Sequence, residues 1–305
     1  MTLETSLNDF KETCQEYIQQ KESSDNLRFN YLFKRDIDVC NYMINVLPSQ
    51  FNVLGTYNRI NITQLILDSL EEFKNFDIHN YKSLCNLIND VEFLTIDDEH
   101  RFLIKMSHFN NNDYPGVVNI VPHSYVIPKI VYDIDVYTLT HEHCHGLKDT
   151  NPLEAKNNLI FGEVIPIFYE LFTLDFENPK KLIMLKHRLK HLNYIKYDYL
   201  MANELVKEEI GCTYFEYDEE EFYLRSIYEY IRSYIGRYLN SFYYAVILYN
   251  MYKENPTKIS DYVSKVLSHE LTTYDMLLEL NIYGDIRGEV FEKELGGIKR
   301  CLKIK

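Results

Sequence analysis

The sequence has no tryptophan, no CxxC pair among its 6 cysteines, and fewer basic than acidic residues. With 32 Lys and Arg against 46 Asp and Glu, the formal net charge is −14, and no basic face for nucleic acid is indicated, so we expect no nucleic-acid partner. Widely scattered cysteines in a chain of 305 residues favour free buried thiols over a disulfide framework. The aromatic residues are 27 tyrosines and 17 phenylalanines, and we expect most of the tyrosines to pack in half-buried positions.

Long apolar runs are also missing. No run approaches the roughly 20 residues that a membrane-spanning helix needs, which predicts no membrane partner. The first residues, "MTLETSLNDFKETC", are polar and acidic, so we expect no signal peptide and a cytoplasmic protein. Hydrophobic residues make up 46% and charged residues 26%, as is usual for a folded protein, and no pattern in the sequence indicates an oligomeric state.

Apolar periodicity predicts a mainly α protein with a small β-sheet before residue 133. Helical spacing runs from Leu7 to Ile18, from Phe29 to Leu47 and from Leu65 to Phe73, the last after a possible cap at Asn61. Short apolar runs that predict strands are "VEFLTI", "RFLIKMSHF", "GVVNIV" and "SYVIPKIVY". Further helices are predicted over 153–176, 179–210, 218–254 and 258–280. We divide the chain into an N-terminal helical region, 1–92, and a second region, 93–305, which together form one continuous unit.

The segment "TLTHEHCHGLKD" contains the pattern HExxH. On a helix, residues four apart lie on one face, so His141 and His145 can present imidazole nitrogens to one zinc ion (Zn²⁺). Glu142 lies beside the first histidine and would act as general base toward a water at the open coordination position. These residues predict a zinc site for hydrolysis.

Two neighbours within the segment allow a different interpretation, a metal store that also uses His143 and Cys144. A helical residue two places after His141 points about 200° away from it, so His143 does not fit the same mononuclear site. Cys144 is offset by about 100° from His145, and we expect it to pack as a small hydrophobe.

A catalytic zinc ion needs a third protein ligand, and "NNLIFGEVIPIFYELFTL" supplies a candidate in Glu163. We expect this apolar helix to pack antiparallel to the HExxH helix after a short loop. A carboxylate in such surroundings is costly to bury without a partner, and a metal would provide one. Glu170, seven residues later, is a candidate acceptor for the N–H of a ligand histidine. Pro166 is expected to remove a helical hydrogen bond and bend the helix near Glu163.

An HExxH helix followed by "GEVIPIFYE" resembles the thimet oligopeptidase and oligoendopeptidase F family of zinc peptidases. The resemblance covers roughly residues 93–255 and implies a zincin-like fold, His141, His145 and Glu163 as zinc ligands, and Glu142 as general base. Three departures from the family's pattern are the place of Pro166, one residue late, a shorter loop between the two helices, and Lys148, where a third histidine usually follows.

The family also has a tyrosine-rich segment whose hydroxyls donate to the substrate carbonyl as it becomes an oxyanion. The segment "YEYIRSYIGRYLNSFYYAVILYNMY" is similar, and its "SFYYA" makes Tyr244 the first candidate. Tyr243, Tyr238 and Tyr234 stay open as alternatives.

Other histidines carry weaker signals. His187 and His191 are four residues apart in "KHRLKHLNY", which we interpret as a solvated basic face. His123 precedes the motif in a strand-like region and could line a cleft.

The sequence therefore favours a zinc metallopeptidase that hydrolyses short peptides. A catalytically inactive binding protein on a peptidase fold and a metal buffer that uses His143 and Cys144 are the alternatives.

Overall fold

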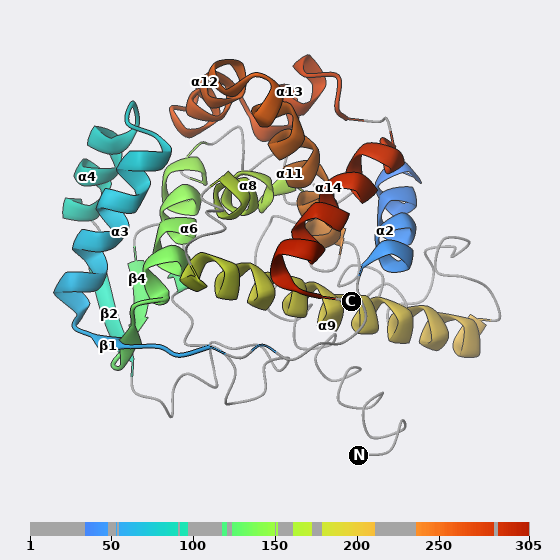
Figure 1. Cartoon of the computed structure of the whole chain (residues 1–305), viewed down its shortest axis with the longest axis horizontal. Coiled ribbons are helices and arrows are strands. Elements are labelled where there is room, and N and C mark those ends of the chain that lie inside the picture. The colour runs from blue at the N-terminus through green and yellow to red at the C-terminus, as the bar shows by residue number, and fades with distance from the viewer. Residues whose placement is uncertain are drawn as a thin grey trace.

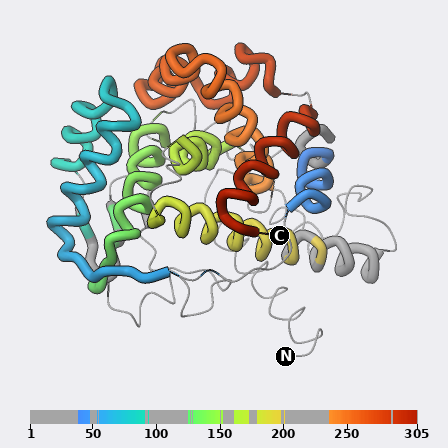
Figure 2. Tube along the Cα trace, in the orientation of Figure 1, coloured from blue at the N-terminus to red at the C-terminus, as the bar shows by residue number. Residues whose placement is uncertain are grey.

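The computed structural model is mainly helical, as the sequence predicts (Figure 1). It describes residues 34–47, 53, 55–90, 92–96, 118–120, 124–149, 151, 161–172, 179–210, 236–283 and 286–304. The helices are α2 (Lys34–Val46), α3 (Ile62–Phe76), α4 (Tyr81–Asp90), α6 (Asp135–Lys148), α8 (Val164–Phe172), α9 (Pro179–Ile210), α11 (Gly236–Glu254), α12 (Pro256–Leu267), α13 (Thr273–Glu279) and α14 (Gly288–Leu302). In the view of Figures 1 and 2, α6 and α8 lie between the pair α3 and α4 and the pair α14 and α2, and α9 crosses below them.

The strands form two small sheets rather than one. They are β1 (Arg59–Ile60), β2 (Glu92–Ile96), β3 (Val118–Ile120), β4 (Ser124–Pro128) and β5 (Val131–Tyr132). Strand β4 pairs in parallel with β2 and antiparallel with β3, while β1 pairs antiparallel with β5. Three of the predicted strand segments are confirmed, the fourth, 101–109, lies outside the described residues, and β1 was not predicted.

A local signal places the start of α3 correctly, whereas a later helix is divided where none of the predicted boundaries lies. The Asn61 side chain accepts a hydrogen bond from the Gln64 amide, so the predicted cap of α3 is confirmed. The predicted helix 258–280 is wrong as a single element, because α12 and α13 are separated by a turn in which His269 adopts a φ of 68°. A capping box at Thr272 then starts α13. The predicted first helix, from Leu7 to Ile18, lies outside the described residues.

One buried core joins helices from both sides of residue 92. The largest cluster contains Val39 and Met43 of α2 together with Phe168 of α8 and Phe242 of α11. Helix α11 packs against α2, α8, α12 and α14, and α3 packs against α6. The division at residue 92 stays a prediction, but within the described residues the two regions share this core.

Within the described part of the chain, no helix combines the length and the apolar character that crossing a membrane requires.

Helix α3 supports α6 through a buried face whose members are Leu65, Ser69, Phe73 and Phe76. The Phe73 ring is fully buried, and its centroid lies 6.4 Å from that of the His143 ring of α6. Leu67, two residues after Leu65 on the same helix, is 57% exposed, because two residues along a helix turn a side chain to the far side.

We predict that Phe73→Ala lowers the free energy of unfolding by about 3–5 kcal/mol, because it leaves a cavity between α3 and α6. Leu67→Ala on the exposed side of the same helix is the matched control and should change it by less than about 0.5 kcal/mol. Urea unfolding of both variants measures the difference, and equal losses would contradict the packing described.

Candidate metal centre

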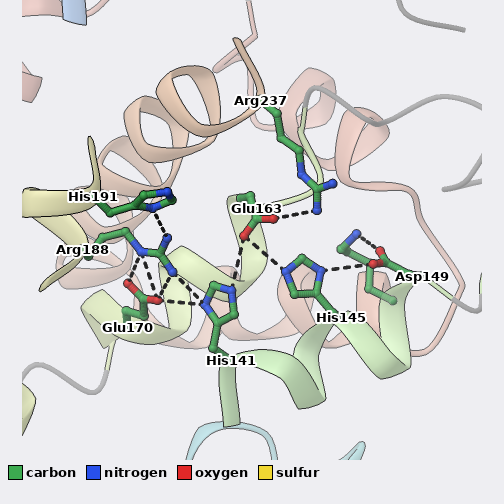
Figure 3. A network of polar contacts seen from close by, with 9 residues as sticks. His141, His145, Asp149, Glu163, Glu170, Arg188, His191 and Arg237 are labelled. Atoms are coloured by element: carbon green, nitrogen blue, oxygen red, sulfur yellow. Dashed lines mark hydrogen bonds and ion pairs between the residues drawn. The ribbon is translucent and has the colours of Figure 1, made fainter. Parts of the chain in front are cut away.

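The HExxH segment lies in the last two turns of α6, so the predicted helix is confirmed. His141 and His145 are one turn apart on the same face, and their ring centroids are 5.1 Å apart. Both side chains are buried, at 6% and 8% relative exposure. The face that they share points toward the N-terminal end of α8 (Figure 3).

His143 and Cys144, the two residues that lie between Glu142 and His145, have other partners. His143 Nε2 lies 3.0 Å from Ser69 Oγ, and its Nδ1 lies 3.1 Å from the Tyr125 hydroxyl. The Ser69 hydroxyl donates to the Ile66 carbonyl, so Nε2–H of His143 donates to Ser69 and Nδ1 accepts from Tyr125. Burial lowers the pKa of His143 to about 3 and raises that of the Cys144 thiol. A neutral histidine with both nitrogens occupied and a buried thiol in the core match the expectation that neither joins the site.

Helix α8 begins directly after Glu163, whereas the sequence predicted a helix over 153–176, of which 161–172 is described. The Glu163 carbonyl accepts a hydrogen bond of 2.9 Å from the Ile167 amide, so Glu163 holds the N-cap position. Pro166 then occupies the first turn, where a backbone N–H has no partner within the helix. The prediction that Pro166 removes a helical hydrogen bond is therefore wrong, and nothing at this position calls for a bend.

Three donor atoms converge between α6 and α8. Oε2 of Glu163 lies 3.3 Å from Nε2 of His141 and 3.2 Å from Nε2 of His145. One ligand atom from each residue lies within 4.8 Å of the other two. Tetrahedral zinc with ligands at about 2.0–2.1 Å places neighbouring donors roughly 3.3 Å apart. The three residues therefore fit a zinc ion by donor type and by spacing.

Glu163 lies near the histidines, but α6 and α8 are not oriented as the sequence predicted. Figure 1 shows α8 nearly end-on while α6 runs along the page, so the two helices cross instead of running antiparallel. The carboxylate approaches from the start of α8, immediately before its first turn. The predicted proximity of Glu163 is confirmed, and the predicted helix arrangement is wrong.

Each candidate ligand histidine is oriented by a carboxylate at its second nitrogen. Nδ1 of His141 lies 2.8 Å from Oε1 of Glu170, as the sequence predicted, and Nδ1 of His145 lies 3.1 Å from Oδ2 of Asp149. When Nδ1 carries the proton and donates it to the carboxylate, Nε2 is left with a lone pair for a metal. Asp149 was missed, although its position one helical turn after His145 could have suggested it.

Two arginines complete the network and were also missed (Figure 3). Arg188 of α9 donates from Nη2 to Oε1 of Glu170 at 2.6 Å and from Nε to Oε2 at 2.9 Å. Arg237 of α11 lies with Nη2 2.6 Å from Oε1 of Glu163. Arg237 therefore supplies a partner for the buried carboxylate, which the sequence analysis assigned to a metal alone.

A third cation, Lys148, has a fully buried side chain that forms an ion pair with the neighbouring Asp149. Among the described residues, each carboxylate of the network thus has its own basic partner. Burial of these charges is tolerated because every one of them is paired.

The segment "KHRLKHLNY" is not the solvated basic face that we predicted. His191 is buried, and its ring centroid is 4.7 Å from that of Tyr238. Nε2 of His187 lies 2.8 Å from the Tyr57 hydroxyl. Arg188 lies between these histidines on the side of α9 that faces the site.

The carboxylates around the cluster favour the protonated form of both candidate ligand histidines. Burial by itself would lower the pKa of His145, but the carboxylates of Glu163 and Asp149 outweigh it and raise the pKa to about 9. The pKa of His141 is also raised, because Glu163 and Glu170 outweigh burial. Against the cost of burial, His145 and Arg237 hold the pKa of Glu163 well below its usual range.

The predicted catalytic residues occupy different surroundings. Glu142 is half-buried on α6, beside His141. Tyr244 is buried on α11, where its ring centroid lies 5.7 Å from that of Phe161 and 6.2 Å from that of Tyr283. Both catalytic roles stay predictions.

Of the alternative tyrosines, the structure describes Tyr243 and Tyr238. The Tyr243 hydroxyl accepts a hydrogen bond of 2.6 Å from the Arg287 amide, at the start of α14. Tyr238 contacts the network, because the guanidinium carbon of Arg188 lies 6.0 Å from its ring centroid. Tyr234 and His123 lie outside the described residues.

Comparison with protein-family models, with curated proteins and with solved structures found no match to this chain.

We predict that zinc binding at pH 7 releases more than one proton per ion. Two imidazoles with raised pKa values must lose their protons before they bind metal, whereas two histidines of ordinary pKa would release about half a proton together. Titration calorimetry in buffers of different ionisation enthalpy measures the release. The number of protons released by the imidazoles should fall as the pH rises through about 9, because His145 deprotonates there in the metal-free protein.

A release of half a proton or less at pH 7 would contradict the ion pairs between these histidines and their carboxylates.

Proposed function

We propose that the chain is a zincin-like, zinc-dependent metallopeptidase that hydrolyses short peptides. One zinc ion would be held by Nε2 of His141, Nε2 of His145 and Oε2 of Glu163. The observation that carries the proposal is the convergence of these three atoms at spacings of 3.2 and 3.3 Å. When bound at such a site, zinc polarises the scissile carbonyl and lowers the pKa of its bound water.

The side chains around this site would transfer protons, orient the ligand imidazoles and stabilise the oxyanion. Glu142, next to a ligand histidine, would accept a proton as general base and return it to the leaving amine. Glu170 and Asp149 would accept hydrogen bonds from Nδ1–H of the ligand imidazoles and so leave Nε2 available to the metal. Tyr244, chosen by resemblance, would donate to the developing oxyanion, and Tyr238 is the second candidate because it already contacts Arg188.

A second candidate function is a binding protein on an inactive peptidase fold, with no metal in the cluster. Arg237 is the observation that favours it, since Glu163 is already paired with a guanidinium and two histidines. Buried ion-pair networks of this kind also occur for structural reasons. Metal content separates the two candidates. A metal buffer is not supported, because both nitrogens of His143 contact hydroxyl groups and the buried Cys144 thiol is not among the three converging ligand atoms.

We predict that Glu142→Gln retains one zinc ion per chain but hydrolyses quenched fluorescent peptides about 10²–10⁴-fold more slowly, because the general base is lost. Glu163→Gln should lose zinc itself, since the amide is a poor zinc ligand. Zinc content by elemental analysis and initial rates on a library of short peptides measure both effects.

The matched control is Glu71→Gln, which removes an exposed carboxylate on α3 and should change neither property. Wild-type rates in Glu142→Gln would refute the assigned base. Unchanged zinc content in Glu163→Gln would refute the third ligand.

A further inference from the structure

Arg237 contacts one oxygen of Glu163 while the other oxygen faces the two histidines. Nη2 of Arg237 lies 2.6 Å from Oε1, and Oε2 lies 3.2 and 3.3 Å from the imidazole nitrogens. The two oxygens of one carboxylate are thus assigned to different partners. Arg237 comes from α11, far along the chain, and its side chain is only 26% exposed.

The glycine before Glu163 makes room for this contact. A Cβ atom at Gly162 would lie 2.9 Å from Cζ, Nε and Nη2 of Arg237, closer than real Cβ contacts allow. The guanidinium therefore lies directly over the backbone that leads into α8. A side chain at position 162 would therefore require the guanidinium to shift.

We infer that Arg237 is a positioning residue that keeps Glu163 a monodentate ligand, by holding Oε1 while Oε2 turns toward the metal. This inference rests on the proposed function, because it concerns how the same site binds its ion. Monodentate binding matters because a catalytic zinc ion keeps a coordination position open for water and substrate. A glutamate that bound through both oxygens would occupy that position.

Burial of Glu163 determines how its binding to the metal should change when Arg237 is removed. Without the guanidinium, Oε1 would be a buried charged oxygen that lacks its partner, which is unfavourable. The metal itself is then the nearest available cation, so the carboxylate is expected to turn and bind through both oxygens. Arg237 also repels the metal, so its removal has two opposing effects on metal affinity. The coordination number of the metal is therefore a sharper readout than its affinity.

Cobalt(II) in place of zinc reports the coordination number directly, because four-coordinate cobalt absorbs visible light more strongly than five- or six-coordinate cobalt. We expect cobalt-loaded wild type to show the intense four-coordinate spectrum. Arg237→Gln, saturated with cobalt, should show weaker bands typical of a higher coordination number. Its kcat on peptides at saturating metal should also fall, by about 10–100-fold.

Gly162→Ala is the second variant, because its Cβ would crowd the guanidinium while leaving every charge in place. It should shift the cobalt spectrum in the same direction. Matched controls lie on α14, where Arg300 is exposed and a Cβ at Gly296 would make an ordinary contact of 3.6 Å with Arg300. Arg300→Gln and Gly296→Ala should both keep the wild-type spectrum.

A wild-type spectrum in folded, cobalt-saturated Arg237→Gln and Gly162→Ala would overturn the inference and leave the metal site standing. A wild-type protein that bound no cobalt and no zinc would overturn the proposed function and this inference together.

Discussion

The carboxylate of Glu163 is the point on which the rest of the site depends. It is buried, and a buried carboxylate is tolerated only when both oxygens have partners. One oxygen faces the imidazoles of His141 and His145, and the other is bound by Arg237. These contacts tie α6, the start of α8 and the start of α11 together at one place. The spacing of the ligand atoms, and therefore the fit to a metal, follows from that junction.

Helix α6 divides its histidines between two environments. One face presents His141 and His145 to carboxylates, which raise the pKa of both imidazoles. The opposite face buries His143 among neutral hydroxyls, where burial lowers its pKa. Two histidines that lie beside carboxylates can exchange protons for a cation, whereas the third is held within the packing by two hydroxyl groups. This separation is what makes a mononuclear centre chemically reasonable.

Local spacing carried most of the successful predictions. The HExxH pattern, the mainly helical class and the cap of α3 depend on residues a few places apart, and so they can be predicted from one sequence. Glu163 was found because a carboxylate in an apolar helix needs an explanation. Arg188 was missed because its segment was interpreted as a solvated basic face, and Arg237 was missed because Glu163 lies far from it in the sequence. Only the packing of α9 and α11 brings the two arginines to the site. The crossing of α6 and α8 escaped prediction for the same reason, since a short loop does not fix a helix angle.

The most direct test of the metal centre is zinc X-ray absorption of the reconstituted wild-type protein. We predict a first shell of nitrogen and oxygen atoms only, at about 2.0–2.1 Å, with scattering from two imidazole rings. A zinc–sulfur distance of about 2.3 Å would show a cysteine thiolate among the ligands instead. That result, or scattering from three imidazoles, would contradict the assignment of His141, His145 and Glu163 as the protein ligands.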